Sequence, residues 1–463
     1  MSEPTSNARS ERAPIAILGV PFDCVTLDQT LALVDEMVAS GRPHYATTVG
    51  VNFLLRAQED VELRRILFDA HLILAEEKSV VWASKILGNS LPQNVTVPHL
   101  IPQLLARAEQ KGWRVFFLGG TDAADAVAEK MRSRNPKLQL VGVYSPPAQP
   151  LLEMDHAAIL RRLREAKPDI LLVAFGCPKQ EKWINMNYRE AGVPFVLGAG
   201  TTFNFLTGAS SSLPARGTVQ LGKFASAVLR QWWELRAKKS ALPRAEANIT
   251  PDPFGDFVIR IPERLGLTEA QAFRAEWLRA VENGHVMFDL SDTILVDSTG
   301  MGVLIRLRKR ARELGHQLFL VAPRPPIEAA LKLMKLDEFF TIQASVAGAR
   351  ILLESSANAP VVTSGVQETE LKIRWSGEVT ALNAVDLGVG TEAELSQVSP
   401  GMTVAIDLSR VSFVDSTGIG LMLRFKKNLT RRDITLKYIN PIASVRNTLQ
   451  HTRLEKYLLG EGV

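Results

Sequence analysis

A polar turn of sequence Asp-Ser-Thr-Gly occurs twice in the chain, at Asp297–Gly300 and at Asp415–Gly418. Each copy follows an apolar run typical of a buried strand and precedes a segment in which basic and apolar residues interleave, as on an amphipathic helix. A phosphate on Ser298 or Ser416 would bring about −1.5 to −2 charges to the start of that helix. The helix dipole would attract this charge and the neighbouring Asp would repel it. The two serines are therefore candidate phosphorylation sites of a binding switch. The alternative is structural, with Asp and Ser capping the helix and Gly permitting the turn.

The two turns lie within a longer internal repeat, Phe288–Arg312 and Ile406–Thr430. Self-similarity over such a length indicates two tandem domains of one kind. Each copy resembles a STAS domain, the fold of sulfate-transporter C-terminal domains and bacterial anti-sigma-factor antagonists, over about Pro251–Glu354 and Thr369–Leu459. The resemblance implies that a partner serine kinase of the anti-sigma-factor type phosphorylates the serine of each turn.

Glycine-rich loops follow three predicted strands in the first half of the chain. Gly119 and Gly120 allow close approach of the backbone, and the helix expected after them offers N–H groups to an anion such as a pyrophosphate. In the second loop, Lys179 and Gln180 could reach a diphosphate or a sugar hydroxyl, and the third loop contains Gly200. None is a P-loop, and the GxGxxG pattern is incomplete. Each loop alone is typical of a tight turn, whereas the three together favour a nucleotide-type pocket.

Strands and helices alternate from Ala13 to about Lys239, which predicts an α/β fold with a doubly wound, mainly parallel sheet. In such a sheet, ligands bind beyond the carboxyl ends of the strands. The predicted strands are Ala16–Gly19, Tyr45–Val49, Leu72–Leu74, Arg114–Gly119, Leu138–Val143, Ile170–Phe175 and Phe195–Gly198. The predicted helices are Thr26–Ser40, Asn52–Asp69, Leu100–Lys111, Asp122–Ser133, Ala157–Ala166 and Lys179–Glu190.

This region, about Ile15–Arg236, resembles the WecG/TagA/CpsF glycosyltransferases of family 26. The resemblance rests on FLGG at Phe117–Gly120, FGCPKQEKWI at Phe175–Ile184, GAGTTFNFLTG at Gly198–Gly208 and VVWASKILGN at Val80–Asn89. It implies transfer of an N-acetylhexosamine from a UDP-sugar to a polyprenyl-diphosphate-linked acceptor at the inner membrane face. It also implies inversion at the anomeric centre, with no cofactor and no metal.

Several positions depart from the family pattern. The family's Thr-x-Asn is Thr48-Val49-Gly50 here, and its Asp-Gly, whose Asp is the general base, is Glu76-Glu77. The Arg expected to hold the diphosphate falls at Asn94, and Gly-Ser-Asp becomes Val97-Pro98-His99. The last family motif, Gly-Gly-Thr-Phe-Asp, becomes Gly200-Thr201-Thr202-Phe203-Asn204.

The candidate site residues follow from what remains. Thr48, Glu76 and Gln180 are the candidate catalytic residues, and Gly119, Gly120, Lys179, Gln180, Glu181 and Gly200 are the candidate substrate-binding residues. A lost Arg–phosphate contact removes roughly 1.5–3 kcal/mol, and a misplaced base can cost about 10²–10⁴ in rate. The pattern predicts a retained fold with weakened or lost chemistry. The alternative is a shifted substrate, with His99 and Glu76 in new roles.

An amphipathic segment, residues 221–239, follows the transferase-like region and carries Trp232 and Trp233 among basic residues. It could be an interfacial helix with its Trp side chains at the headgroup level of a membrane. The alternative is a docking helix that packs on the sheet domain or on a STAS neighbour.

The composition fits three cytoplasmic domains. At 463 residues the chain has room for them, and a net charge of +5 is too small to indicate nucleic-acid binding. Cys24 and Cys177 have no metal-ligand spacing, no apolar run reaches 18 residues, and no signal peptide is evident. The expected division is a tail (1–12), a transferase-like domain (13–240), a linker (241–250), a STAS domain (251–354), a linker (355–366) and a second STAS domain (367–463).

Three functions fit these features. The first is regulation or scaffolding of envelope or exopolysaccharide synthesis by a degenerate transferase domain and two STAS switches. The second is an active N-acetylhexosaminyltransferase whose STAS domains tune its activity. The third is an anti-sigma-factor antagonist with an inert first domain. Peripheral contact with the inner face of the plasma membrane and self-association are further expectations.

Overall fold

The structure is a computed structural model that describes residues 13–120, 129, 131–200, 218–236, 248–251, 256–356, 363–367, 370–381, 383–396 and 398–460. The chain divides into two compact units. The first comprises Met1–Ala148, Asp155–Ile184 and Tyr188–Leu353, and the second comprises Gln149–Met154, Asn185–Asn187 and Glu354–Val463. The expected helix over Asp122–Ser133 and the loop after Gly200 lie largely outside the described residues.

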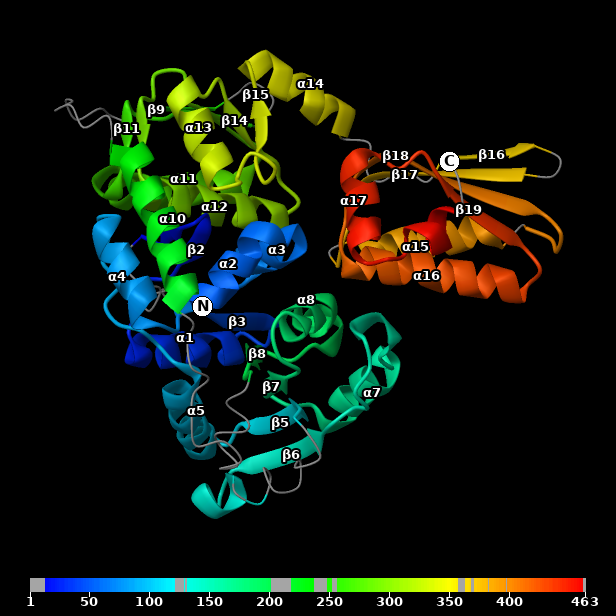
Figure 1. The fold of residues 1–463 in the computed structure, drawn as a ribbon, viewed down its shortest axis with the longest axis horizontal. Helices are drawn as coiled ribbons and strands as arrows, with labels where there is room; N and C mark the ends of the chain where they lie inside the picture. The colour runs from blue at the N-terminus through cyan, green and yellow to red at the C-terminus, as the bar shows by residue number, and fades with distance from the viewer. Residues whose placement is uncertain are drawn as a thin grey trace, which may run out of the picture. The chain divides into compact units, whose positions relative to one another are not determined.

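A six-stranded sheet forms the centre of the transferase-like domain in the first unit (Figure 1). Its strands are β3 (His44–Val49), β4 (Leu72–Ala75), β5 (Arg114–Gly119), β6 (Gln139–Tyr144), β7 (Ile170–Ala174) and β8 (Phe195–Gly198). They pair in parallel in the order β4-β3-β8-β7-β5-β6. The predicted doubly wound α/β fold is confirmed. Apolar runs such as Ile170–Val173 are fully buried, as expected of strands covered on both faces.

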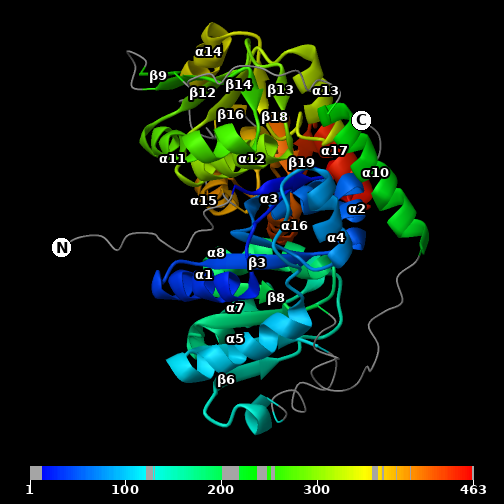
Figure 2. The same ribbon diagram turned by 90° about the vertical axis from the view of Figure 1, so that its left-hand side faces the viewer.

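Helices cover both faces of this sheet, with α1 and α5 on one side and α7 and α8 on the other (Figures 1 and 2). The helices of the domain are α1 (Leu27–Ala39), α2 (Val51–Glu59), α3 (Val61–Asp69), α4 (Lys78–Ile86), α5 (Val97–Lys111), α7 (His156–Ala166), α8 (Lys179–Ala191) and α10 (Thr218–Arg236). A short 3₁₀ helix, η1, spans Leu151–Glu153. Helix α10 contacts α2 and α4.

Two local predictions were wrong. The strand expected at Ala16–Gly19 is an antiparallel hairpin outside the main sheet, formed by β1 (Ile15–Ile17) and β2 (Val20–Phe22). Its turn places Leu18 at φ 49° and Gly19 at φ 81°, the left-handed region that reverses the chain. The single helix expected over Asn52–Asp69 is broken at Asp60, whose carboxylate accepts a hydrogen bond from Leu63 N at 2.9 Å and caps α3.

The first repeat forms a five-stranded sheet in the order β15-β14-β12-β10-β9, beside a two-stranded pair β11-β13. Only the β9–β10 pairing is antiparallel. The strands are β9 (Asn248–Pro251), β10 (Phe257–Arg260), β11 (Arg264–Leu265), β12 (Val286–Asp289), β13 (Leu295–Val296), β14 (Leu318–Val321) and β15 (Thr341–Gln343). The helices are α11 (Leu267–Asn283), α12 (Ser298–Glu313), α13 (Pro325–Leu333) and α14 (Val346–Ser356).

The second repeat forms a four-stranded sheet in the order β16-β17-β18-β19, in which only β16–β17 is antiparallel. Its strands are β16 (Thr363–Gln367), β17 (Glu370–Val379), β18 (Thr403–Val414) and β19 (Thr435–Ile439). Its helices are α15 (Ala384–Leu395), α16 (Ser416–Arg431), α17 (Ala443–His451) and α18 (Glu455–Leu459). The two repeats therefore share one α/β architecture.

The two Asp-Ser-Thr-Gly turns join a buried strand to a helix, as predicted. Asp297 Oδ1 accepts hydrogen bonds from Thr299 N at 2.8 Å and Gly300 N at 3.0 Å. In the second copy, Asp415 Oδ1 accepts one from Gly418 N at 2.9 Å. The Asp residues therefore cap the helices. Phosphorylation of Ser298 and Ser416 stays a prediction.

Candidate functional site

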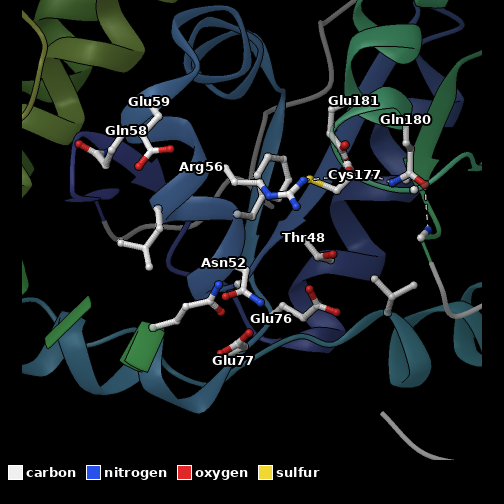
Figure 3. Close-up of a pocket in the computed structure, with 18 of the residues that line it drawn as sticks. Thr48, Asn52, Arg56, Gln58, Glu59, Glu76, Glu77, Cys177, Gln180 and Glu181 are labelled. Atoms are coloured by element: carbon white, nitrogen blue, oxygen red, sulfur yellow. Dashed lines mark hydrogen bonds between the residues drawn. The ribbon is translucent and has the colours of Figure 1, made fainter. Parts of the chain in front are cut away.

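A cavity of about 730 Å³ opens at the carboxyl ends of strands β3, β4 and β8 (Figure 3). This is the place at which a doubly wound sheet binds its ligand. Its described lining residues come from these strand ends, from the loop before α8 and the start of that helix, and from α2, α5 and α10. They are Thr48, Gly50, Asn52, Phe53, Leu55, Arg56, Gln58, Glu59, Glu76, Glu77, Val97, Gly176, Cys177, Gln180, Glu181, Gly198, Ala199, Gly200, Gln220 and Lys223.

Five of the sequence-predicted site residues meet in this pocket. They are Thr48, Glu76, Gln180, Glu181 and Gly200. They lie far apart in the sequence, and the parallel sheet brings them together because successive strands end at one edge. All three candidate catalytic residues are among them.

The other predicted binding residues are not among the described lining residues of the pocket. A Cβ added at Gly119 would lie 2.5 Å from Ala174 O, and Gly120 N donates to the same oxygen at 3.0 Å. Gly119 is therefore needed for contact between neighbouring strands. The Lys179 ammonium lies 5.5 Å from the centre of the Phe175 ring, and burial lowers the Lys179 pKa.

The Gln180 side chain fixes the loop after β8. Its Oε1 accepts a hydrogen bond from Gly200 N at 2.9 Å, and its Nε2 donates to Glu181 Oε1 at 2.9 Å. A Cβ at Gly198 would lie 2.2 Å from Gln180 Nε2, so only glycine leaves room for this amide. Gln180 thus holds two walls of the pocket together and orients Glu181.

Glu181 is a buried carboxyl group in the pocket wall, with only 6% of its surface exposed. Desolvation raises its pKa, while the hydrogen bond from Gln180 opposes this shift. A carboxyl group that retains its proton more readily can donate a hydrogen bond to a ligand oxygen. This makes Glu181 a candidate hydrogen-bond donor or general acid.

Glu77 occupies the space beside Gly50. A Cβ at Gly50 would lie 2.5 Å from Glu77 Oε1, and Glu77 Oε2 accepts a hydrogen bond from Ser79 Oγ at 3.0 Å. The two departures from the family pattern are therefore coupled in space. The side chain absent at position 50 makes room for the carboxylate present at position 77.

Glu76 lines the pocket immediately after β4, and its backbone N–H donates to Val49 O at 3.1 Å. Asn94, which stands where the resemblance implies an Arg, donates from Nδ2 to Glu76 O at 3.3 Å. His99 is exposed and its Nδ1 lies 2.8 Å from Thr96 Oγ1, at the start of α5. His99 is not among the described lining residues, so the structural role fits it better than a new catalytic role.

Sequence reasoning missed the polar stripe of α2. Asn52, Arg56 and Glu59 are spaced i, i+4 and i+7, and all three line the pocket. Arg56 Nη1 donates to Cys177 O at 3.3 Å, across to the loop that begins α8 (Figure 3). The spacing was visible in the sequence directly after the Thr48 strand. Gln220 and Lys223, from the distant α10, gave no comparable signal.

Helix α10 packs one side on its neighbours and leaves the other exposed. Phe224, Val228 and Gln231 are 1% exposed or less, whereas Leu229 is 49% and Trp233 is 68% exposed. The helix therefore docks on the protein and still presents apolar side chains outward. Trp82 of the adjacent α4 is 48% exposed.

The described residues include no cluster of three or more His, Cys, Asp or Glu side chains that could hold a metal ion. None of the helices in the described part of the chain is long and apolar enough to cross a bilayer.

Comparisons with known proteins identify the domains. Residues 15–218 match the model of the WecG/TagA/CpsF glycosyl transferase family. Residues 244–349 match the STAS domain model, and residues 362–460 match a second STAS model, described as Mlab, STAS domain.

Curated relatives match the first domain. The N-acetylglucosaminyldiphosphoundecaprenol N-acetyl-beta-D-mannosaminyltransferase of Staphylococcus aureus strain NCTC 8325 / PS 47 is 26% identical over 216 residues, which cover 45% of this chain and 82% of that protein. The protein of the same description from strain COL matches to the same extent. A solved structure assigned as an anti-sigma factor antagonist of Thermotoga maritima is 22% identical, with a TM-score of 0.22, and the match covers 23% of this chain and 94% of that one. The chain thus consists of a WecG/TagA/CpsF-family glycosyl transferase domain followed by two STAS domains.

Proposed function

We propose that this chain regulates or scaffolds the synthesis of an envelope or exopolysaccharide, with a transferase domain whose catalysis is weakened or lost. The observation that carries this proposal is the Glu77 carboxylate, which lies in the space next to Gly50 inside the pocket. The pocket of about 730 Å³ lies at the carboxyl ends of the strands, which supports a retained binding function.

The charge of the pocket supports weak binding of a nucleotide sugar. Among its described lining residues, the acidic side chains are Glu59, Glu76, Glu77 and Glu181, and the cationic ones are Arg56 and Lys223. The diphosphate of a UDP-sugar is anionic and gains most from paired cations. Carboxylates gathered around the same cavity oppose its entry.

The ligand class is taken from the relatives. Their description names an acceptor sugar joined through a diphosphate to undecaprenol. For this chain we propose a UDP-sugar or a polyprenyl-diphosphate lipid as the ligand. The exposed apolar side chains of α10 and α4 support peripheral contact with the membrane that holds such a lipid.

The STAS domains supply the regulatory part of the proposal. Both Asp-Ser-Thr-Gly helices are formed and capped. We propose that they report to a serine kinase of the anti-sigma-factor type through Ser298 and Ser416.

An active N-acetylhexosaminyltransferase is the second candidate. The observation in its favour is that Thr48, Glu76 and Gln180 line one cavity. In that case Glu76 would act as the general base. Its longer side chain would have to take the proton from the acceptor hydroxyl, as an Asp does in the family pattern.

Titration of the full-length chain with UDP in a calorimeter tests the proposed pocket. We expect a dissociation constant of about 1 mM or weaker. Arg56→Ala should abolish this residual binding, while Arg164→Ala, at an exposed arginine of α7 outside the lining, should leave it unchanged. Micromolar binding by the natural chain would contradict a degenerate site.

A further inference from the structure

Helix α12 of the first STAS domain lies against the β1–β2 hairpin of the transferase domain, within the same compact unit. A Cβ at Gly302 would lie 2.6 Å from Pro14 O, so the helix needs a glycine where the hairpin's backbone crosses it. Ala13, Ala16, Phe68 and Leu235 of the transferase domain belong to the same hydrophobic core as the STAS residues. Such a shared core is typical of a permanent interface.

Basic residues of α12 bind backbone carbonyls of the transferase domain. Arg306 donates to Ala70 O at 2.8 Å and to Pro21 O at 3.2 Å, and it also pairs with Asp23. Lys309 Nζ donates to Ala70 O at 2.7 Å. Lys309 is only 9% exposed, and this burial lowers its pKa to about 8.

Gln231 of α10 joins three segments at the centre of this interface. Its Oε1 accepts from Leu18 N at 2.8 Å, and its Nε2 donates to Ala16 O at 2.8 Å. The same Nε2 donates to Ser298 Oγ at 3.0 Å. Gln231 and Ser298 are both 0% exposed. A buried polar side chain that makes several hydrogen bonds favours one arrangement of the segments it joins. Any other arrangement would leave buried polar groups without a hydrogen bond, which costs free energy.

Helix α10 also reaches the pocket. Gln220 and Lys223 line the cavity, and Gln231 lies eight residues beyond Lys223 on the same helix. At a rise of 1.5 Å per residue this is about 12 Å along a continuous rod. A displacement at Gln231 would therefore move the Gln220 and Lys223 side chains that line the pocket.

We propose that the transferase domain is the resident partner of the first STAS domain, and that the Ser298–Gln231 contact is a latch that couples this STAS domain to the pocket through α10. In this proposal the serine turn of the first repeat binds another domain of the same chain, through the hydrogen bond between Ser298 and Gln231. The latch helps to hold the hairpin, α10 and α12 in one arrangement, and its loss loosens the contacts among them.

The second repeat provides an internal comparison. Gly420 corresponds to Gly302 in the aligned turns, and no atom lies within 4 Å of the Cβ position at Gly420. Arg424 and Lys427 correspond to Arg306 and Lys309, and both are exposed. The two similar helices thus have different surroundings at these three pairs of positions.

Hydrogen exchange of the full-length chain, followed by mass spectrometry, tests the latch. Gln231→Leu keeps most of the side-chain volume and removes its hydrogen bonds to Leu18, Ala16 and Ser298. We expect exchange at least about tenfold faster in the hairpin (15–22), in α12 and in α10, including its pocket end. The same substitution at Gln103, an exposed glutamine of α5, should leave these segments unchanged.

A pair of matched serine variants gives a second, independent test. Ser298→Asp places a carboxylate in the buried latch and should reproduce the effect of Gln231→Leu, whereas Ser416→Asp should not affect the hairpin or α10. The proposal is overturned if the hairpin, α12 and α10 exchange in Gln231→Leu at the same rate as in the wild type. If that variant does not fold, an unchanged exchange rate in Ser298→Asp overturns the proposal. Sugar transfer and UDP binding play no part in the readout, so the latch and the proposed function can fail separately.

Discussion

At the residue scale, the burial of Glu181 in the pocket makes the free energy of unfolding depend on pH. Its pKa is raised above 4.5 by desolvation, so the folded chain binds this proton more tightly than the unfolded chain does. The free energy of unfolding therefore falls as pH rises above about 4.5, because the unfolded state then gains from ionising Glu181.

Glu181→Gln removes this cost and keeps an oxygen that can accept the hydrogen bond from Gln180. We expect the variant to be more stable than the wild type at pH 8, and the difference to shrink toward zero at pH 4. Urea unfolding at a series of pH values measures it. A difference that does not change with pH would show that Glu181 has an ordinary pKa.

Gly50 and Glu77 form a second pair whose effects should be coupled. Gly50→Asn would push Glu77 from its place and from the Ser79 hydroxyl, and we expect a loss of about 1–2 kcal/mol. Combining it with Glu77→Gly should restore the room and recover most of that loss. A double-mutant cycle of unfolding free energies measures the coupling.

The control for this cycle is Gly222→Asn in α10, where no atom lies within 4 Å of the Cβ position. It should change stability little. Additive effects of Gly50→Asn and Glu77→Gly would contradict the spatial coupling.

Some of the site was readable from single residues. Thr48, Glu76, Gln180 and Glu181 were identified because they stand in or beside motifs at strand ends. The contact between Gly50 and Glu77 could not be predicted, because the two positions are 27 residues apart and the sequence does not show that they are close in space. They are close because β3 pairs in parallel with β4, and the ends of the two strands lie side by side.

At the scale of elements, the contact between α12 and the turn before β4 should respond to acid. Burial lowers the pKa of His71 well below 6.5, and nearby Lys309 and His44 act in the same direction. Arg306 and Arg189 add to this effect, while Glu313 Oε1 lies 3.8 Å from His71 Nε2. Tyr45 N donates to His71 Nδ1 at 3.2 Å, which requires the neutral ring.

The unfolded chain takes up a proton on His71 below about pH 6.5, whereas the folded chain does not. Stability from the neutral histidine is therefore present above this pH and lost as the pH falls below it. We expect His71→Asn to lose less stability than the wild type between pH 7 and pH 5, as measured by thermal unfolding. An unchanged pH dependence would show that other groups control the acid response.

The elements themselves were largely predictable, because short and strongly apolar runs such as Ile170–Val173 favour buried strands. The hairpin at Ile15–Phe22 could not be predicted. Its apolar residues fit a strand of the main sheet equally well, but they are buried against α12, which lies nearly 300 positions away in the sequence. The contact with α12 therefore decided that this segment forms a hairpin outside the main sheet.

At the scale of the whole molecule, two copies of one motif have different surroundings. The sequence repeat predicted two equivalent switches. The structure buries Ser298 completely against Gln231, so a kinase would reach it only after the latch opens. No sequence pattern could show this contact, because Gln231 belongs to another domain.

The exposed side of α10 should bind lipid surfaces. Trp233 and Leu229 lie one helical turn apart beside Arg230, and Trp82 is exposed on the neighbouring α4. We expect the full chain to float with vesicles that contain anionic lipid, and Trp82→Ala with Trp233→Ala to reduce the bound fraction several-fold.

Val385→Ala with Val389→Ala is the matched control, since both valines are exposed on α15 of the second STAS domain. This variant should float like the wild type. Equal loss in both variants would indicate non-specific adhesion, and no loss in the Trp variant would contradict a membrane role for α10.

Sugar transfer is the measurement that tests the central claim most directly. The full chain would be mixed with a panel of UDP-N-acetylhexosamines and a prenyl-diphosphate-GlcNAc acceptor. A second chain would carry Gly50→Asn, Glu76→Asp, Glu77→Gly and Asn94→Arg, which include both members of the coupled pair. We predict no turnover by the natural chain and measurable turnover by the substituted one. Turnover by the natural chain would contradict a degenerate site and would make Glu76 the leading general base.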